Sequence, residues 1–487
     1  MTELKKKSIN SAKWNLLANM GQYVFTFFLS IVLSRMISPA EFGLTSMLSI
    51  FISLATLLVG SGLSTALIRD KNSTEEDFST VFYFNILISL LLYTILFFSA
   101  PLIAKFYNQP ELIDLTRWIT LVFVINSFGL IQNTILVINL NFRKQTLINM
   151  SGLIISVFIS IIMALNDYGV YSIVAQSLSQ ALIVNVLLWL TSKWRPKGVF
   201  NIQSFKKLWK FSSNILFTGM FTSLMMNIDN LIVGKIFKPT VLGLFVRAKS
   251  TRAIPEMIFV NMLNTTSFSI LSKVNDNKAE FNQKHMLFFK LSAYFIIPFV
   301  VGFSACSHHI IEILYGEKWM DSVLFLKIVS FVTIPNLMAA LFTQTILSFG
   351  NSSIYMKINV FKRVLNLFSI PVGIFFGIEM FILSIVIIAY IGFFIDIYFI
   401  SKIIGTKRIE YFNILIKPVA FSLIMYMCLF VIQEFVDFNN LVNLFLEVTI
   451  SISLYVTLLI FFDKAILNYF VEFLKSFILK KRQKGVT

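Results

Sequence analysis

One ten-residue phrase occurs twice in this chain and divides it into two halves. Residues 35–44 read RMISPAEFGL, and residues 235–244 read KIFKPTVLGL. The basic residue, the proline, the glycine and the final leucine coincide at an offset of 200 positions. Repetitive apolar sequence can also produce two similar hairpin turns by chance. The shared register favours two homologous halves, which are typical of transporter folds.

The composition identifies an integral membrane protein. The chain has 487 residues, of which 57% are hydrophobic and 53 are phenylalanine, and its mean hydropathy is +0.81. A soluble protein of this size has no interior large enough for so much apolar surface. Apolar runs of about 20 residues recur from end to end, and each is long enough to cross a bilayer as a helix. Since lipid offers backbone groups no partner, helices are expected rather than open strands.

Hydropathy predicts about fourteen transmembrane helices. We expect an all-α fold in which two six-helix lobes, related by a pseudo-two-fold axis, are followed by two C-terminal helices. The expected spans are 12–36, 42–68, 80–104, 112–138, 147–166, 170–191, 212–236, 242–270, 287–313, 322–349, 353–376, 380–401, 411–434 and 440–462. They define an N-terminal lobe at 1–200, a C-terminal lobe at 201–405, two further spans within 406–462 and an amphipathic cytoplasmic tail at 463–487.

Positive charge predicts the orientation of these spans. The formal net charge is +17, and in a membrane protein the positive-inside rule explains most of it. Residues 5–7 are three lysines before the first span, and alternate loops are rich in lysine and arginine, as at 193–210. Both termini are therefore expected in the cytoplasm, and the two halves share one orientation. A nucleic-acid partner is not expected. The segment 205–211, which alternates aromatic and basic residues, is predicted to be an interfacial helix.

Signatures of catalysis and metal binding are missing from the sequence. Cys306 and Cys428 both lie in apolar runs, where a small buried residue is the simpler interpretation. His308 and His309 are adjacent, so on a helix they diverge by about 100° and do not form a metal pair. No phosphate-binding loop, zinc-ligand spacing or kinase motif occurs. We therefore expect no enzyme activity, no cofactor and no metal site.

Two of the expected spans carry a polar stripe. In the first span, Asn19 and Gln22 belong to a set of polar residues at steps of three and four. In the seventh, Thr222 and Asp229 lie on one face, and Thr222 is the partner of Gln22 at the offset of 200. These stripes predict either helix packing through small polar residues or a hydrated cavity between the halves, and we favour the cavity. Asp229 is the candidate ion-coupling residue; simple neutralisation of a nearby cation is the alternative.

Charged residues inside the expected spans are mostly cations, and they concentrate in the second half. Each costs at least a few kcal/mol at mid-depth, so a functional reason is expected. The candidate substrate-binding residues are Arg247, Lys249, Arg252, Asn359, Lys362, Arg363 and Asn366, together with Asn19, Gln22 and Thr222. Lys290 and Asp396 are expected to reach the headgroups instead. For Arg247 both interpretations stay open. A cationic, water-lined cavity implies an anionic passenger, and guanidinium suits phosphate.

The chain resembles the polysaccharide transporter family of the multidrug/oligosaccharidyl-lipid/polysaccharide exporter superfamily, which includes Wzx-type O-antigen flippases. The residues that carry the resemblance are Trp14, 35–43, 62–68, 100–104, 194–196, 229–235, 243–248, Pro255 and 315–319. Each motif alone is weak, whereas their ordered set is fairly specific. At 245–246 the chain has Phe-Val where the family usually has Tyr-Ser, which leaves local specificity open.

The resemblance implies two six-helix lobes around a central cavity, with two further helices. It implies a multi-pass protein of the bacterial cytoplasmic membrane that moves undecaprenyl-pyrophosphate-linked oligosaccharide to the outer leaflet by alternating access, for O-antigen, capsule or exopolysaccharide synthesis. Membrane lipids are expected contacts, and a glycan polymerase and chain-length proteins are candidate partners. Three alternatives remain: a multidrug antiporter, a lipid II flippase of the same superfamily, and a membrane glycan polymerase or ligase. The antiporter usually has twelve spans and an acidic cavity, and the polymerase a large outer loop.

Removing either favoured arginine tests this interpretation. We expect Arg252→Ala and Arg363→Ala each to abolish transport while membrane insertion stays intact, because each removes a cation from the predicted cavity. Complementation of a transporter-deficient strain measures the first effect, and the membrane content of the variants measures the second. Complementation at the wild-type level by both variants contradicts the assignment.

Overall fold

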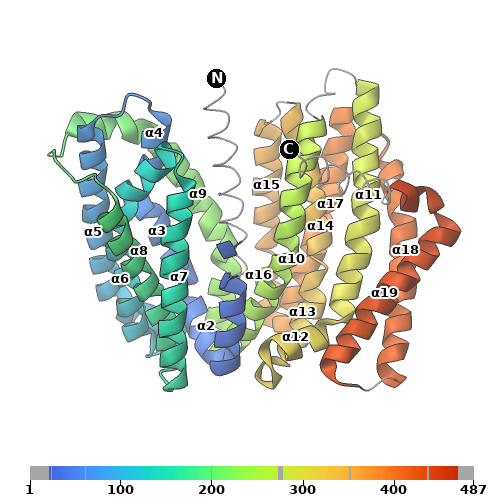
Figure 1. Cartoon of the computed structure of the whole chain (residues 1–487). Helices are drawn as coiled ribbons and strands as arrows, with labels where there is room; N and C mark the ends of the chain where they lie inside the picture. Colours follow the sequence, from blue (N-terminus) through green and yellow to red (C-terminus); the bar gives the residue numbers. More distant parts are fainter. Residues whose placement is uncertain are drawn as a thin grey trace, which may run out of the picture. The chain divides into compact units, whose positions relative to one another are not determined.

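The protein is helical throughout the part of the chain that its structure describes. The structure is a computed structural model, and it describes residues 21–22, 25–60, 62–198, 200–271, 278–349, 352–435 and 438–469. Within these residues every regular element is a helix, so the all-α part of the predicted fold class is confirmed (Figure 1).

The first helices are α2 (Pro39–Met47), α3 (Ser49–Gly60), α4 (Leu63–Arg69), α5 (Glu75–Tyr107), α6 (Leu112–Ile138), α7 (Phe142–Leu165), α8 (Tyr171–Thr191) and α9 (Ile202–Ile236). They are followed by α10 (Pro239–Leu271), α11 (Lys278–Ala305), α12 (Ser307–Tyr315), the short 3-10 helix η1 (Glu317–Trp319), α13 (Ser322–Ser330) and α14 (Thr333–Ser348). The last are α15 (Ser352–Asn366), α16 (Ser369–Phe376), α17 (Ile378–Ile404), α18 (Arg408–Phe435) and α19 (Asn440–Phe462).

Twelve helical segments of the described residues are long and apolar enough to cross a membrane. The prediction was about fourteen. The expected span 12–36 begins outside the described residues, and only its part Phe25–Met36 is a described apolar helix. The expected span 242–270 does form a helix, α10, but is not among the twelve segments. Its first half carries four charged side chains, which lower its hydropathy.

Several predicted spans are broken helices, and proline explains two of the breaks. The span 322–349 divides into α13 and α14, and the span 353–376 divides into α15 and α16. Pro335 and Pro371 lie within the first turns of α14 and α16. A proline ring clashes with the carbonyl four residues earlier, so the preceding helix ends there. In the first half, Gly62 has a left-handed φ of 67° and separates α3 from α4.

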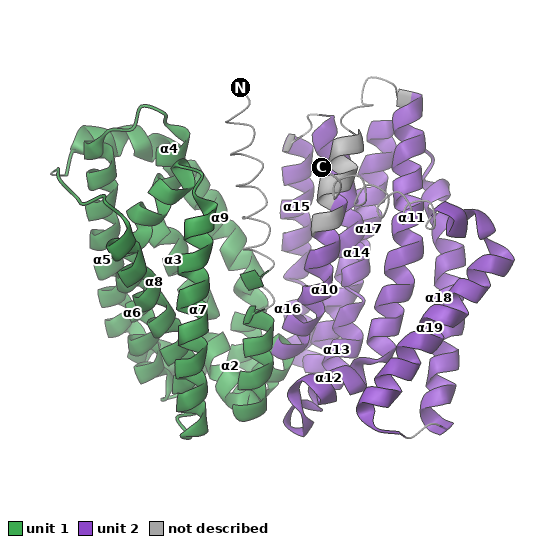
Figure 2. Cartoon of the chain, in the orientation of Figure 1, with its two compact units in different colours: residues 1–246 green, residues 247–487 purple. Residues whose placement is uncertain are grey.

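The helices divide into two compact units, residues 1–246 and 247–487 (Figure 2). In the first unit α5 packs on α6, α7 on α8, and α9 on α3, α4 and α5. In the second unit α11 packs on α18, α17 on α14, α15 and α16, and α19 on α18. The boundary between the two units falls inside α10. The repeat and the hydropathy predicted other divisions, namely lobes at 1–200 and 201–405, two spans within 406–462 and a tail at 463–487. Those divisions stay predictions, and residues 470–487 lie outside the described part.

The repeated phrase begins a helix in each half. Ser38 caps α2: its backbone N–H donates to the Glu41 carboxylate at 2.8 Å, and its hydroxyl accepts from the Glu41 N–H at 3.4 Å. This reciprocal capping box, with Pro39 at the first helical position, sets the start of α2. In the second copy Pro239 is likewise the first residue of its helix, α10. The sequence repeat is therefore a repeat of local structure.

The two copies of the phrase pack directly against each other in the first unit. A Cβ added at Gly43 would overlap the carbonyl oxygen of Pro239, and one added at Gly243 would overlap the carbonyl oxygen of Pro39. The same Gly243 Cβ would lie 3.1 Å from the backbone nitrogen of Gly43. The contact is thus reciprocal, and only glycine allows the two backbones to come so close. Small residues have this role in membrane bundles because apolar side chains gain little by leaving lipid.

Polar side chains fasten α9 to α3. The Ser223 hydroxyl bonds the Ser53 hydroxyl at 2.9 Å, and the Asn227 amide donates to the same hydroxyl at 3.1 Å. One helical turn further, the Asn230 amide donates to Ser49 at 3.3 Å. These three residues lie on another face of α9 than the predicted stripe, so this contact shows helix packing through small polar residues but does not test the interpretation of the stripe.

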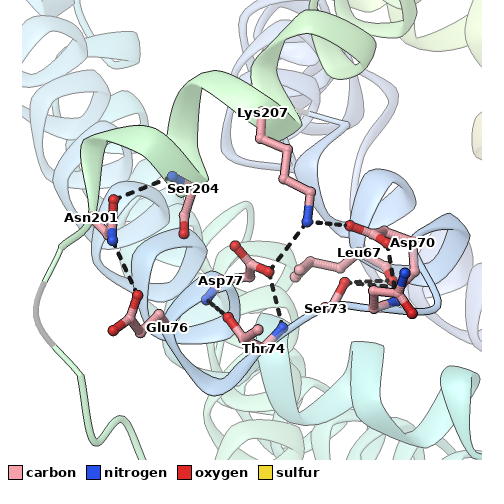
Figure 3. A network of polar contacts seen from close by, with 10 residues as sticks. Leu67, Asp70, Ser73, Thr74, Glu76, Asp77, Asn201, Ser204 and Lys207 are labelled. Carbon is pink, nitrogen blue, oxygen red and sulfur yellow. Dashed lines mark hydrogen bonds and ion pairs between the residues drawn. The ribbon is translucent and has the colours of Figure 1, made fainter.

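A second set of contacts fastens the first turns of α9 to the corner between α4 and α5 (Figure 3). Lys207 Nζ lies 2.6 Å from the Asp70 carboxylate and 3.8 Å from that of Asp77, which caps α5 with Thr74. The hydrogen bond from Lys207 is the main cause that lowers the pKa of Asp70, which follows the membrane segment. The predicted interfacial helix 205–211 is thus the beginning of α9, and its Phe205 and Trp209 rings stack 5.3 Å apart.

Substitution of either glycine in the repeat is expected to disrupt the first unit. Gly43→Ala and Gly243→Ala each place a methyl group on a backbone carbonyl, which has no rotamer with which to move away. We expect both variants to lose monodisperse protein in size-exclusion chromatography and to melt at lower temperature. The matched control is Gly60→Ala, since a Cβ there meets nothing within 4 Å. Wild-type melting of the Gly43→Ala variant contradicts the close contact.

Candidate functional site

The predicted polar stripe of α9 lies away from its packed face. Asn214 and Thr218 are exposed and Thr222 is half-buried, whereas Ser212 and Ser223 are buried. At about 100° per residue Asn214 and Thr218 lie well away from Ser212 and Ser223, whereas Thr222 lies between the two sets. Asn214 and Thr218 are therefore not used for packing inside the first unit.

The other candidates of the first half are described only in part. Gln22 is exposed, and Asn19 lies outside the described residues. Asp229 is half-buried on α9 and takes part in a polar or electrostatic interaction. Its role in ion coupling therefore stays a prediction, as does binding by Gln22 and Thr222.

Arg247 lies in an aromatic box of the second unit. Its guanidinium carbon is 4.8 Å from the centre of the Tyr315 ring and 4.9 Å from that of Trp319. The Tyr315 hydroxyl also bonds the Thr251 hydroxyl at 2.9 Å. Arg247 is 5% exposed, so its charge is stabilised by π faces within the protein. Arg247 therefore connects α10 to the segment 315–319, and its role in substrate binding stays a prediction.

Arg252 is paired with a carboxylate that sequence analysis missed. Its Nη2 lies 3.2 Å from a carboxylate oxygen of Glu256, one helical turn further along α10. The other Glu256 oxygen accepts a 2.8 Å hydrogen bond from the Asn336 amide on α14. The spacing of i and i+4 is the usual one for an ion pair on a helix, so Glu256 could have been found from the sequence. Lys249, on the same helix, is half-buried.

The helix α15 packs against α17 and carries the predicted polar stripe. Lys362 pairs with Asp396 on α17, and Lys357, Ile358 and Phe361 line an apolar groove of about 940 Å³ against α17. Asn359, Arg363 and Asn366 are all half-buried. Their spacing on the helix places them on one side, and their role in binding stays a prediction.

Arg363 is a half-buried cation of α15, whereas Lys357 on the same helix is exposed. It forms no hydrogen bond or ion pair with any other described residue. A guanidinium that is half-buried on a membrane helix without a protein partner needs water or an anion. Among the predicted binding residues, Arg363 is therefore the strongest candidate for contact with an anionic ligand.

Lys362, adjacent to Arg363, is held in a buried ion pair. Its Nζ lies 2.7 Å from a carboxylate oxygen of Asp396 on α17. Asp396 is 4% exposed, so the prediction that it reaches the headgroups was wrong. The spacing within one helix cannot reveal this pair, because its partners come from different helices. Whether Lys362 also binds substrate stays a prediction.

Lys290 belongs to a third polar cluster, at the end of α19. The Asp463 carboxylate lies 4.0 Å from Lys290 Nζ and 3.5 Å from Lys417 Nζ, and accepts a 2.7 Å hydrogen bond from the Tyr294 hydroxyl. Burial raises the pKa of Asp463, but the Tyr294 hydrogen bond and the two lysine charges outweigh burial and lower it. Lys290 thus pairs with a carboxylate at the end of its helix bundle.

A buried carboxylate also joins α19 to α12 and α18. One Glu447 oxygen lies 3.1 Å from His309 Nδ1 and accepts a 2.7 Å hydrogen bond from the Gln433 amide. Sequence analysis considered His309 only as a metal ligand and did not include Glu447. Among the described residues no group of three or more histidine, cysteine or acidic side chains could hold a metal ion. The contact therefore fastens the C-terminal helices to the unit.

Comparisons with known proteins were made on sequence and on structure. Residues 32–324 match the model of the family described as polysaccharide biosynthesis protein. The chain is 25% identical to the teichuronic acid biosynthesis protein TuaB of Bacillus subtilis over 69% of this chain and 70% of that protein. It is 21% identical to the lipopolysaccharide biosynthesis protein WzxC of Escherichia coli over 76% of each chain.

Two solved structures show the fold. The lipid II flippase MurJ, in an inward closed conformation, superposes with a TM-score of 0.73 at 19% identity and covers 92% of this chain and 99% of its own. An inward-facing multidrug resistance MATE transporter superposes with a TM-score of 0.61 at 16% identity over 79% of this chain and 96% of its own. The helices of this chain therefore have a fold that is shared by a lipid II flippase and a multidrug resistance transporter.

Neutralising Glu256 is expected to strengthen the binding of an anionic ligand. In Glu256→Gln the Arg252 charge is no longer compensated by its neighbour on α10, while the amide can keep the Asn336 contact. We expect about fivefold tighter binding of inorganic pyrophosphate, equivalent to about 1 kcal/mol, in equilibrium binding to the detergent-solubilised protein. Glu410→Gln, an exposed position at the start of α18, is the control. Equal affinities for the wild type and Glu256→Gln would exclude Arg252 from the anion site.

Proposed function

The chain belongs to the polysaccharide biosynthesis protein family, and we propose that it is a flippase for polyprenyl-pyrophosphate-linked oligosaccharide. The lipid-linked glycan enters from the cytoplasmic leaflet of a bacterial cytoplasmic membrane and leaves in the outer leaflet. The observation that carries the proposal is the stripe of Asn359, Arg363 and Asn366, whose arginine has no partner among the described residues.

The chemistry of that stripe suits the proposed passenger. Arginine presents a rigid fork of donors that matches phosphate oxygens, and amides bond both phosphate and sugar hydroxyls. Arg252 is the second candidate, because its partner Glu256 is itself shared with Asn336. The polar stripe of α9, with Thr222 and Asn214, offers hydroxyl and amide groups to the glycan.

The energy for transport is proposed to come from the membrane potential or a coupled ion. An inside-negative potential favours outward movement of negative charge by about 2.3 kcal/mol per charge per 100 mV. Alternating access of the two predicted lobes then exposes the site to each side in turn. Asp229 remains the proposed carrier of a coupled proton in the first unit, and both termini are proposed to lie in the cytoplasm.

The rival functions differ in the charge or chemistry that they require. A multidrug antiporter for cations needs an acidic site, whereas the half-buried intramembrane residues that favour an anion here are basic. A lipid II flippase moves a related pyrophosphate lipid and differs in its glycan. A glycan polymerase needs catalytic groups over the sugars, and none is visible among the described residues. The named relatives in teichuronic acid and lipopolysaccharide synthesis support the proposed flippase function.

Reconstituted transport distinguishes these possibilities. Purified protein is reconstituted in liposomes whose inner leaflet holds a fluorescent pyrophosphate-linked oligosaccharide on a short prenyl chain. A lectin in the outer medium reports the glycan that has crossed to the outer leaflet. We expect transfer by the wild type and loss of most transfer by Arg363→Ala. The control is Lys357→Ala, which changes the groove face of the same helix.

Three results contradict the proposal. Protein-driven movement of a cationic dye without movement of the glycan lipid indicates an antiporter. Formation of longer glycans indicates an enzyme. Equal transfer by protein-containing and protein-free liposomes excludes transport of this class of lipid.

A further inference from the structure

The ion pair between Lys362 and Asp396 has features that a static helix clamp does not need. The 2.7 Å pair joins α15 to α17. Its two sides are unequally buried, because the lysine side chain is 22% exposed and the aspartate side chain is 6% exposed. The lysine can therefore be reached by water or a ligand, while the carboxylate is closed off behind it.

The lysine reaches the carboxylate across a glycine. A Cβ at Gly392 would lie 2.8 Å from Lys362 Cδ, so the absence of a side chain there makes room for the lysine stem. Gly392 and Asp396 are four residues apart on α17 and share one face. The same arrangement leaves the lysine flexible, because four rotatable bonds separate its ammonium group from α15.

Lys362 is the charged group that compensates Asp396. Other charged residues on helices packed against α17 are Lys327 on α13, Lys357 and Arg363 on α15, and Arg408, Glu410, Lys417 and Glu434 on α18, while α14 and α16 contain none. On α17 itself Glu379 and Lys402 lie near its two ends. The one ion pair of Asp396 with a described residue is that with Lys362.

We propose that Asp396 is a proton-binding site that is coupled to the substrate through Lys362. This inference rests on the proposed function. Arg363 and Lys362 leave α15 in directions about 100° apart, so one pyrophosphate can contact both only if the flexible Lys362 side chain swings toward Arg363. When a pyrophosphate occupies Arg363, its second phosphate draws Lys362 away from Asp396 in this way. The carboxylate is then left buried without a counter-charge, and it takes a proton from water on one of its oxygens. When the pyrophosphate leaves, Lys362 returns and Asp396 releases the proton.

The charge balance explains why a proton is the ligand. An isolated carboxylate in a low-dielectric site is neutralised rather than kept charged. A metal cation would need several ligands around it, whereas among the described residues Asp396 belongs to no group of three or more histidine, cysteine or acidic side chains that could hold a metal ion. When Lys362 withdraws, Asp396 gains one proton, so the contact between α15 and α17 carries no net charge in either state.

Proton uptake on binding can be counted directly. The probe is a pyrophosphate diester of a short prenyl alcohol and N-acetylglucosamine, whose acidic groups stay ionised near neutral pH. Titration calorimetry of the detergent-solubilised full chain, in buffers of different ionisation enthalpy, gives the protons bound for each ligand bound. We expect about one proton for the wild type, and a Kd that rises up to about tenfold per pH unit.

Variants of the pair give opposite effects on affinity. Asp396→Asn is expected to bind the diester several-fold more tightly, with no proton uptake and a Kd independent of pH, because Lys362 is no longer held. Lys362→Gln is expected to bind more weakly and also without uptake. Asp396→Glu keeps a carboxylate and should restore uptake, which covers the case in which the asparagine variant does not fold. Asp463→Asn, another lysine-paired aspartate of this unit, is the control with wild-type uptake.

The outcomes separate this inference from the function on which it rests. If the folded wild type does not bind the diester, the proposed function is wrong. If it binds with no proton uptake and with a pH-independent Kd, or if sodium replaces the proton, the function stands and the coupling through Asp396 is overturned. Uptake that persists in Asp396→Asn has the same meaning.

Discussion

The contact between the two copies of the repeated phrase is the constraint on which the first unit depends. Gly43 lies against the carbonyl of Pro239, and Gly243 lies against that of Pro39. In a bilayer, apolar side chains gain little by exchanging lipid for protein, so helices associate through close backbone approach and polar contacts. The glycines supply the first and the bonds from α9 to Ser49 and Ser53 supply the second. The segment that is repeated in sequence is therefore also the segment where α2 and α10 meet.

The lipid surroundings also explain how the charged side chains are arranged. A charge inside the membrane must find a partner, an aromatic face or water. Arg252 has Glu256, Lys362 has Asp396, and Arg247 has two aromatic rings. Arg363 has neither a charged partner nor an aromatic face among the described residues, although it lies next to a lysine that has a partner. A half-buried cation in this situation is a better guide to a binding site than a count of charges.

The sequence predicted the helices well and the contacts between them poorly. The spans 112–138 and 440–462 coincide with α6 and α19, since a long apolar run has few alternatives in lipid. The breaks near Pro335 and Pro371 were missed because hydropathy does not register a proline clash. The stripe of Asn359, Arg363 and Asn366 was found from its spacing alone. The pair of Lys362 with Asp396 could not be found that way, since 34 positions of sequence separate its members.

The fold by itself does not choose between the candidate passengers, because a lipid II flippase and a multidrug transporter share it. What distinguishes them is the sign of the charge that each site must offer. In this chain Glu256 on α10 and Asp396 on α17 are each paired with a cation, so a cationic drug would have to displace a lysine or an arginine to reach these two carboxylates. The proposed anionic passenger meets the opposite situation, because it takes over cations that the protein holds with carboxylates and leaves those carboxylates behind. In the proposed function the same ion pairs therefore supply both the selectivity for phosphate and the means of coupling.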